Sequence, residues 1–132
     1  MPRILIVDDS NAVREQLRRV VERNPEWEVC GEARDGREAI DQALDRSPEV
    51  ILLDYRLPVM NGLQAAREIS RLAPDIRILL CSMHVSSDLS EAARDAGCQG
   101  AVSKYDSRLI IMAIAAMLRR ETFFSAEVTS SW

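Results

Sequence analysis

Charged and hydroxyl side chains follow four apolar runs of the chain, at the points where those runs end. They are Asp8 and Asp9 after residues 4–7, Asp54 after residues 50–53, Ser82 after residues 76–81 and Lys104 after residues 100–103. Carboxylates brought together from separate strands repel one another, which raises at least one pKa unless a cation lies among them. Mg²⁺ suits such oxygen ligands, and a lysine and a hydroxyl can hold the remaining oxygens of a phosphoryl group. The set therefore predicts a magnesium-assisted phosphoryl site.

A purely structural explanation of the acids is that they cap the helices that follow the strands. Capping explains Asp9 or Ser10 taken alone about as well as a shared site does. It explains the whole set poorly, because the polar residues stand at four strand ends in this order.

Other kinds of site fit the sequence less well. No GxGxxG follows the first apolar run and no GxxxxGK[ST] occurs, which disfavours a dinucleotide site or a P-loop. His84 is the only histidine, so a multi-histidine metal site is excluded. A Ser-His-Asp triad would need Ser82 or Ser86 beside His84 with an orienting acid, and the sequence has no nucleophile elbow.

The elements that carry these side chains must bring the ends of the runs to one place. The runs alternate with amphipathic segments: Ser10 can cap a helix in which Leu17 faces the core and Arg14 turns outward. Strands are predicted at residues 4–7, 28–33, 50–53, 76–81 and 100–103, and helices after Ser10, after an Asp35-Gly36 turn, at residues 63–72 and 88–96, and from an Asp106 cap to about residue 120. Strict alternation gives a parallel sheet with helices on both faces, and ligands bind beyond the carboxyl ends of its strands.

The composition describes one globular domain and excludes several classes of protein. Its 132 residues match one domain, and 47% hydrophobic with 29% charged residues excludes a disordered chain. The net charge of −4 argues against a module that grips nucleic acid unaided. No apolar run approaches the roughly 18–20 residues that span a bilayer, and acids come too early for a secretory signal. Cys30, Cys81 and Cys98 are expected to be reduced core thiols of a cytoplasmic protein.

Four segments together resemble the receiver domain of two-component response regulators. The matching segments are residues 4–10, residues 50–58 with Asn61-Gly62, residues 79–84 and residues 97–104. The resemblance covers residues 3 to about 120, and Met83-His84 resembles the NarL/LuxR-type branch. It implies an α/β flavodoxin-like (βα)5 three-layer sandwich with parallel strand order 2-1-3-4-5, whose switch point lies between the strands that carry Asp8 and Asp54.

The resemblance also implies a role for each acid. Asp54 would be the phosphoacceptor, whose carboxylate attacks the phosphorus of a phosphohistidine on a partner sensor histidine kinase. Asp9, Asp54 and the backbone carbonyl of Arg56 would hold Mg²⁺, and Asp8 would bind it mainly through water. The cation is needed because an anionic nucleophile cannot approach an anionic phosphoryl group until both are screened.

The remaining site residues take their implied roles from the same pattern. Lys104 would pair with one phosphoryl oxygen, and Ser82 would hydrogen-bond another and so report phosphorylation to the far face. Hydrolysis by an in-line water would reset the switch. Arg56, Met83 and His84 stand where the family tunes the access of that water; the plainer reading of His84 is a partly exposed loop residue.

Two positions depart from the family pattern. Ala101 stands where the family commonly has Tyr or Phe, so we expect displacement of the loop and helix around Ser82 and residues 83–90 to carry the signal. Lys104 is followed by Tyr105 in place of proline, and the family pattern predicts a cis bond there, although a cis bond without proline costs about 3–4 kcal/mol.

The last predicted helix is apolar on more than one side, since residues 109–118 are ten apolar residues without a break. One stripe can line the core: Ile110, Ile114, Met117 and Leu118. A second stripe consists of Leu109, Met112 and Ala116. We expect a protein partner to cover this second stripe, through a homodimer or a docked output domain; ordinary packing under the C-terminal tail is the alternative.

The chain divides into an expected receiver, residues 1–120, and a tail, residues 121–132. The tail resembles the stretch between receiver and helix-turn-helix in NarL/LuxR-type transcription factors. DNA would then be contacted only through an output domain that does not follow within this chain. The alternative is a stand-alone or degenerate receiver that acts through protein contacts.

Two other classes of function fit the sequence less well than a signalling switch. A phosphatase with an aspartyl-phosphate intermediate would want a second acid two residues after the nucleophile, where Arg56 stands. A flavodoxin-like electron carrier is disfavoured because no phosphate-cradling loop follows the first strand. The expected protein is therefore a switch that catalyses only its own phosphorylation and dephosphorylation.

Overall fold

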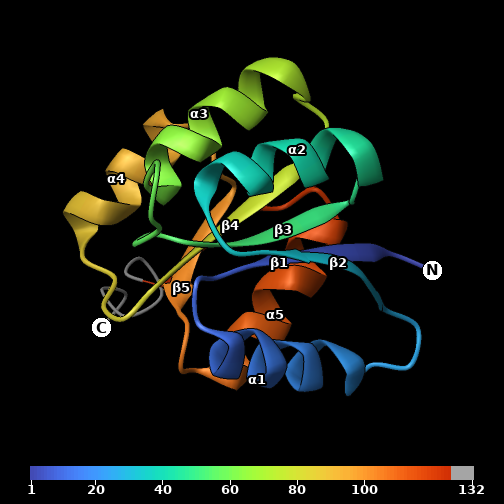
Figure 1. The fold of residues 1–132 in the computed structure, drawn as a ribbon. Coiled ribbons are helices and arrows are strands. Elements are labelled where there is room, and N and C mark those ends of the chain that lie inside the picture. Colours follow the sequence, from blue (N-terminus) through green and yellow to red (C-terminus); the bar gives the residue numbers. More distant parts are fainter. Residues whose placement is uncertain (126–132) are drawn as a thin grey trace.

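The computed structural model describes residues 1–125, which form a three-layer α/β sandwich (Figure 1). The strands are β1 (Arg3–Val7), β2 (Glu28–Ala33), β3 (Val50–Asp54), β4 (Arg77–Ser82), β5 (Gly100–Ser103) and β6 (Phe123–Phe124). The helices are α1 (Asn11–Glu22), α2 (Gly36–Arg46), α3 (Gly62–Leu72), α4 (Ser87–Asp95) and α5 (Ser107–Leu118). Figure 1 places α2, α3 and α4 on one face of the sheet and α1 and α5 on the other.

The sheet is parallel throughout, with strand order β2-β1-β3-β4-β5-β6. The predicted alternation and the order 2-1-3-4-5 are therefore confirmed. Because the central strands are covered on both faces, their apolar residues divide between two cores. On β1, Leu5 and Val7 pack toward α2–α4, and Ile4 and Ile6 pack toward α1 and α5.

Every helix in residues 1–125 begins at a polar N-cap whose side chain accepts a hydrogen bond from the backbone N–H three residues later. These caps are Ser10, Asp35, Asn61, Ser86 and Asp106. A cap satisfies backbone donors that have no partner within the helix. The caps set where each helix starts, one or more residues beyond the carboxyl end of the preceding strand.

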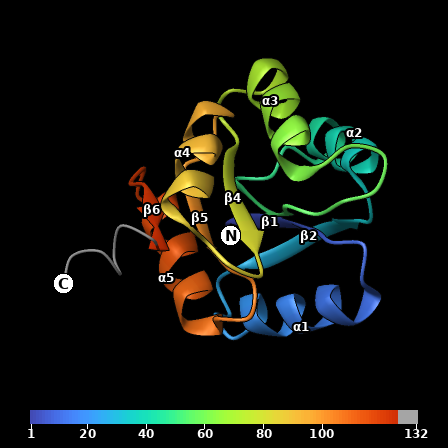
Figure 2. The ribbon, with the colours of Figure 1, turned by 90° about the vertical axis from the view of Figure 1, so that its left-hand side faces the viewer.

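A sixth strand, which the sequence pattern does not predict, follows α5. The chain reverses at Arg120, whose φ of 65° is left-handed, and β6 then pairs with β5 through the register Gly100↔Phe123 and Ala101↔Phe124. A strand of two residues is too short to show a periodic pattern in the sequence, so only the tertiary structure reveals β6. Figure 2 shows β6 at the sheet edge beside β5.

Three further expectations are corrected by the structure. The Lys104–Tyr105 peptide bond is trans, since residues 1–125 contain no cis bond, and without proline the amide keeps its strong trans preference. Arg14 is buried, where the helical pattern turned it outward. Ala116 is only 5% exposed and does not belong to an open stripe. The chain folds back after α5, where the Glu121 amide donates to the Ala116 carbonyl.

Within the described part of the chain, no helix has the length and hydropathy needed to cross a bilayer. All three cysteines are free; Cys81 and Cys98 are buried and Cys30 is partly exposed.

Candidate functional site

The three predicted acids meet at the carboxyl ends of β1 and β3. Asp8 and Asp9 follow β1 directly, and Asp54 is the last residue of β3. Because β1 and β3 are parallel neighbours in register, with Val7 opposite Leu53, their ends bring these carboxylates together. One carboxylate oxygen from each of the three acids lies within 4.8 Å of the others. Asp8 and Asp54 are buried, whereas Asp9 is exposed.

Lys104 reaches the same point from the end of β5. Its Nζ lies 3.2 Å from Oδ2 of Asp8 and 3.4 Å from Oδ1 of Asp54. The side chain is itself 11% exposed, so one ammonium group sits between two buried carboxylates. The backbone N–H of Lys104 donates to the carbonyl of Ser82, which ties the ends of β4 and β5 together.

The charges at this point are not balanced. Burial and the charge of Asp8 raise the pKa of Asp54 to about 6, although the Lys104 ammonium opposes this rise. Burial also disfavours the charged form of Lys104, but the carboxylates of Asp54 and Asp8 outweigh it and raise the pKa of the lysine. Three carboxylates facing one ammonium form a set of hard oxygen donors with surplus negative charge. These donors fit a divalent cation such as Mg²⁺.

Asp8 is held in place by hydrogen bonds that the sequence pattern missed. Its Oδ1 accepts from the backbone N–H of Ser10 at 2.9 Å. Its backbone carbonyl accepts from Nη1 of Arg14 at 2.7 Å, and Nε of Arg14 pairs with Glu32 at 2.9 Å. Helical periodicity cannot predict this contact, because it depends on how α1 lies against β2.

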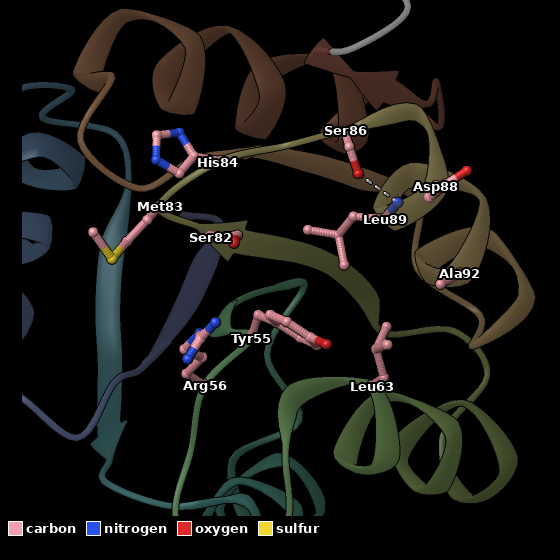
Figure 3. A pocket seen from close by; sticks show the side chains of 10 residues that line it. All are labelled: Tyr55, Arg56, Leu63, Ser82, Met83, His84, Ser86, Asp88, Leu89 and Ala92. Atoms are coloured by element: carbon pink, nitrogen blue, oxygen red, sulfur yellow. Dashed lines mark hydrogen bonds between the residues drawn. The ribbon is translucent and has the colours of Figure 1, made fainter.

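The hydroxyl residue and the predicted tuning residues lie beside the acids, around a pocket of about 530 Å³ between the β4–α4 loop, α3 and α4 (Figure 3). Ser82 ends β4 and is partly buried. Arg56, Met83 and His84 line the same pocket and are exposed at its rim, with Met83 56% exposed. His84 is thus an exposed loop residue close to the site.

The predicted interface residues lie on α5, away from this pocket. Met112 is 47% exposed and Leu109 is partly buried against the α1–α5 core. With Ala116 buried, Leu109 and Met112 remain as the accessible part of the stripe.

A scan against family models matches residues 4–116 to the response regulator receiver domain. The chain belongs to this family. The receiver is 35% identical to a LuxR-family two-component response regulator from Aurantimonas, with a TM-score of 0.91 over 97% of this chain and 92% of that one. It is 31% identical to the receiver of the putative NarL of Mycobacterium tuberculosis, with a TM-score of 0.81 over 86% of this chain and 93% of the other.

Among curated proteins, the receiver is 29% identical over 127 residues to the transcriptional regulatory protein DegU of Brevibacillus brevis. That match covers 96% of this chain and 54% of DegU, so the chain spans about half the length of this relative. It is also 46% identical over 81 residues to a protein-glutamate methylesterase/protein-glutamine glutaminase of Carboxydothermus hydrogenoformans, covering 61% of this chain and 23% of that protein. The matched segment is therefore part of longer relatives that carry different names. The receiver domain itself is a signalling module and not a classical enzyme.

Proposed function

We propose that the protein is a magnesium-dependent phospho-acceptor switch in which Asp54 takes a phosphoryl group from a sensor histidine kinase. The observation that supports this most strongly is the meeting of Asp54, two further acids and Lys104 at one end of the sheet. A new bond forms between a carboxylate oxygen of Asp54 and phosphorus, while the phosphorus–nitrogen bond of the kinase phosphohistidine breaks. The histidine leaves with the electron pair of that bond and takes up a proton, so the product is an acyl phosphate.

The residues proposed to hold Mg²⁺ are Asp9, Asp54 and the backbone carbonyl of Arg56, with Asp8 mainly through water. Their oxygen-only chemistry and surplus negative charge support this assignment. Bound there, the ion would screen the repulsion between carboxylate and phosphoryl group and orient them for in-line transfer.

Other residues of the receiver bind the phosphoryl oxygens and control the access of water. Lys104 pairs with a phosphoryl oxygen, for which its Nζ between Asp8 and Asp54 is suitably placed. Ser82 donates a hydrogen bond from its hydroxyl group to another oxygen and carries the change into the loop that leads to α4. Arg56, Met83 and His84 border the pocket and set how easily water reaches the acyl phosphate, so that Arg56→Ala and His84→Ala alter the dephosphorylation rate.

Labelling with acetyl phosphate and Mg²⁺ tests the proposed acceptor. Wild type should gain one acid-stable, hydroxylamine-labile phosphate, and Asp54→Asn should gain none. Asp95→Asn, which neutralises an exposed acid on α4, is the matched control and should label like wild type. Label retained in Asp54→Asn would place the acceptor elsewhere, and an unlabelled wild type that still binds Mg²⁺ would make this a degenerate receiver that acts by protein contacts alone.

We further propose a cytoplasmic protein whose effector is transcriptional. The support is the likeness to DegU and to a LuxR-family regulator, with DNA contacted only through an output domain outside this chain. A homodimer through α5 is part of the same proposal. The alternative is a stand-alone receiver that acts through protein contacts. If that receiver is degenerate, it takes up no phosphoryl group in the labelling experiment above.

A further inference from the structure

The short strand β6 divides its two aromatic rings between the two cores of the domain. The backbone N–H of Phe123 donates to the carbonyl of Gln99 at 3.0 Å, which anchors β6 to the edge of β5. Phe123 packs against the α1–α5 core, whereas Phe124 joins the α2–α4 core. Phe124 is 2% exposed and is among the largest fully buried side chains of the described residues.

Phe124 lies beside the smallest side chain on β5. Its cross-strand partner is Ala101, which is completely buried in the same core. The methyl group of Ala101 leaves room on this face of β5, and the neighbouring strand supplies the ring that fills it. The guanidinium of Arg94 on α4 lies 3.9 Å from the centroid of this ring, a cation–π contact. The ring is therefore held between β5 and α4.

The buried residues of helix α4 are small, and Leu89 packs against the same core from a partly buried position. These buried residues are Ser90 and Ala93, and the Oγ of Ser90 has no hydrogen-bond partner in the described structure. A buried hydroxyl without a partner destabilises the packing that buries it. Leu89 and Ala92 on α4 border the 530 Å³ pocket that Ser82 also lines (Figure 3). Helix α4 thus borders the pocket that Ser82 lines, and its Arg94 guanidinium lies over the ring of Phe124.

We propose that β6 is a latch whose docking depends on the position of α4. The buried ring of Phe124 couples the two elements, so that a shift of α4 weakens the docking of β6, and loss of the Phe124 ring loosens α4; such coupling is reciprocal. The next step rests on the proposed function: phosphorylation of Asp54 acts through Ser82 and α4 to change the docking of β6. Because β6 is the edge strand of the sheet, a change in its docking is an output at the surface of the receiver.

Backbone hydrogen exchange in Phe124→Ala and Phe123→Ala tests the latch, because both variants remove one ring from the same strand but from opposite faces. In Phe124→Ala the amides of α4 should exchange about tenfold faster than in wild type. In Phe123→Ala, the matched control, the amides of α4 should exchange as in wild type. Unchanged exchange of α4 in Phe124→Ala, or equal acceleration in both variants, would overturn the coupling.

A second arm of the experiment separates the latch from the proposed function. Wild type is treated with acetyl phosphate and Mg²⁺, its phosphoryl content is measured by mass, and exchange at residues 121–125 is then followed. Faster exchange there in the phosphorylated protein supports the latch as an output, and unchanged exchange refutes that output while the phospho-acceptor function stands. If no phosphoryl group is taken up, the proposed function fails, and the pair of phenylalanine variants alone decides whether α4 and β6 are coupled.

Discussion

At the scale of single residues, the decisive feature is that a buried carboxylate pair shares one ammonium. Asp8 and Asp54 are both buried, and the Nζ of Lys104 lies within 3.4 Å of each. Each acid alone could be a helix cap; together they form a site whose charge favours a cation. Neutralising one acid should therefore change both the stability of the protein and its metal binding.

Removing the charge of Asp54 should stabilise the metal-free receiver. Its pKa in the folded protein, about 6, lies above the ordinary value of 3.8, so between these values the folded state binds more protons than the unfolded state. The free energy of unfolding of wild type therefore falls as pH rises through this window, by about 1–3 kcal/mol. In urea unfolding with EDTA, the free energy of unfolding of Asp54→Asn, relative to that of wild type, should rise by this amount between pH 4 and about pH 7. A difference that stays constant with pH would contradict this.

Asp9 should affect metal binding far more than folding. It is exposed, so Asp9→Asn should change the free energy of unfolding by no more than about 0.5 kcal/mol in EDTA. With Mg²⁺ at ten times its Kd, wild type should gain about 1.4 kcal/mol, and Asp9→Asn should lose most of that gain. Thermal unfolding with and without Mg²⁺ measures both quantities. Asp95→Asn serves as the control, and an equal loss there would mean that the effect is general surface charge.

At the scale of elements, the edge of β5 is built to receive β6. A Cβ on Gly100 would lie 2.6 Å from the carbonyl oxygen of Phe123 and 2.9 Å from Cδ1 of Leu79. A larger residue at position 100 cannot coexist with the docked strand. The next residue, Ala101, is small on the opposite face, where Phe124 packs. Both small residues thus have a packing reason in this chain.

Moving the aromatic ring from β6 to β5 should show that the two positions share one space. Ala101→Phe should destabilise the protein by about 1–3 kcal/mol, because the core beside Phe124 is already filled. In a Phe124→Ala background the same change should cost at least about 1 kcal/mol less. Urea unfolding of the four proteins in this cycle measures the coupling.

The matched cycle uses Phe123→Ala, whose ring lies on the other face of the sheet. There the cost of Ala101→Phe should change by no more than about 0.5 kcal/mol, because the ring of Phe123 lies in the other core and shares no space with position 101. Coupling of equal size in both cycles would refute a shared space and indicate a general loss of β6.

At the scale of the whole molecule, the phosphoryl site and the candidate interface use different elements. The site lies at the carboxyl ends of β1, β3, β4 and β5, while Leu109 and Met112 lie on α5. Met112 is 47% exposed on a helix whose other face is fully buried. An exposed apolar side chain of this size is suited to a protein contact.

A glutamate at position 112 should abolish a homodimer formed through α5, because the contact would bury its charge. We expect the parent protein to sediment as a dimer and Met112→Glu as a monomer. Leu44→Glu is the matched control, since Leu44 is 49% exposed on α2, on the opposite face of the sheet, and should leave the dimer intact. Sedimentation of both the parent and Met112→Glu as the same monomer would rule out dimerisation here.

The sequence by itself determined the alternation of elements, the strand order through its family resemblance, and which acids, lysine and hydroxyl stand at the strand ends. Apart from the strand order, these features are local, because apolar runs, caps and strand ends span only a few residues. Only the tertiary structure decided that Arg14 turns inward to Asp8, that Ala116 is buried, that the Lys104–Tyr105 bond is trans and that β6 adds to the sheet. Most of these depend on contacts between elements far apart in the chain, and a periodic pattern holds no information about which distant element will fill a space.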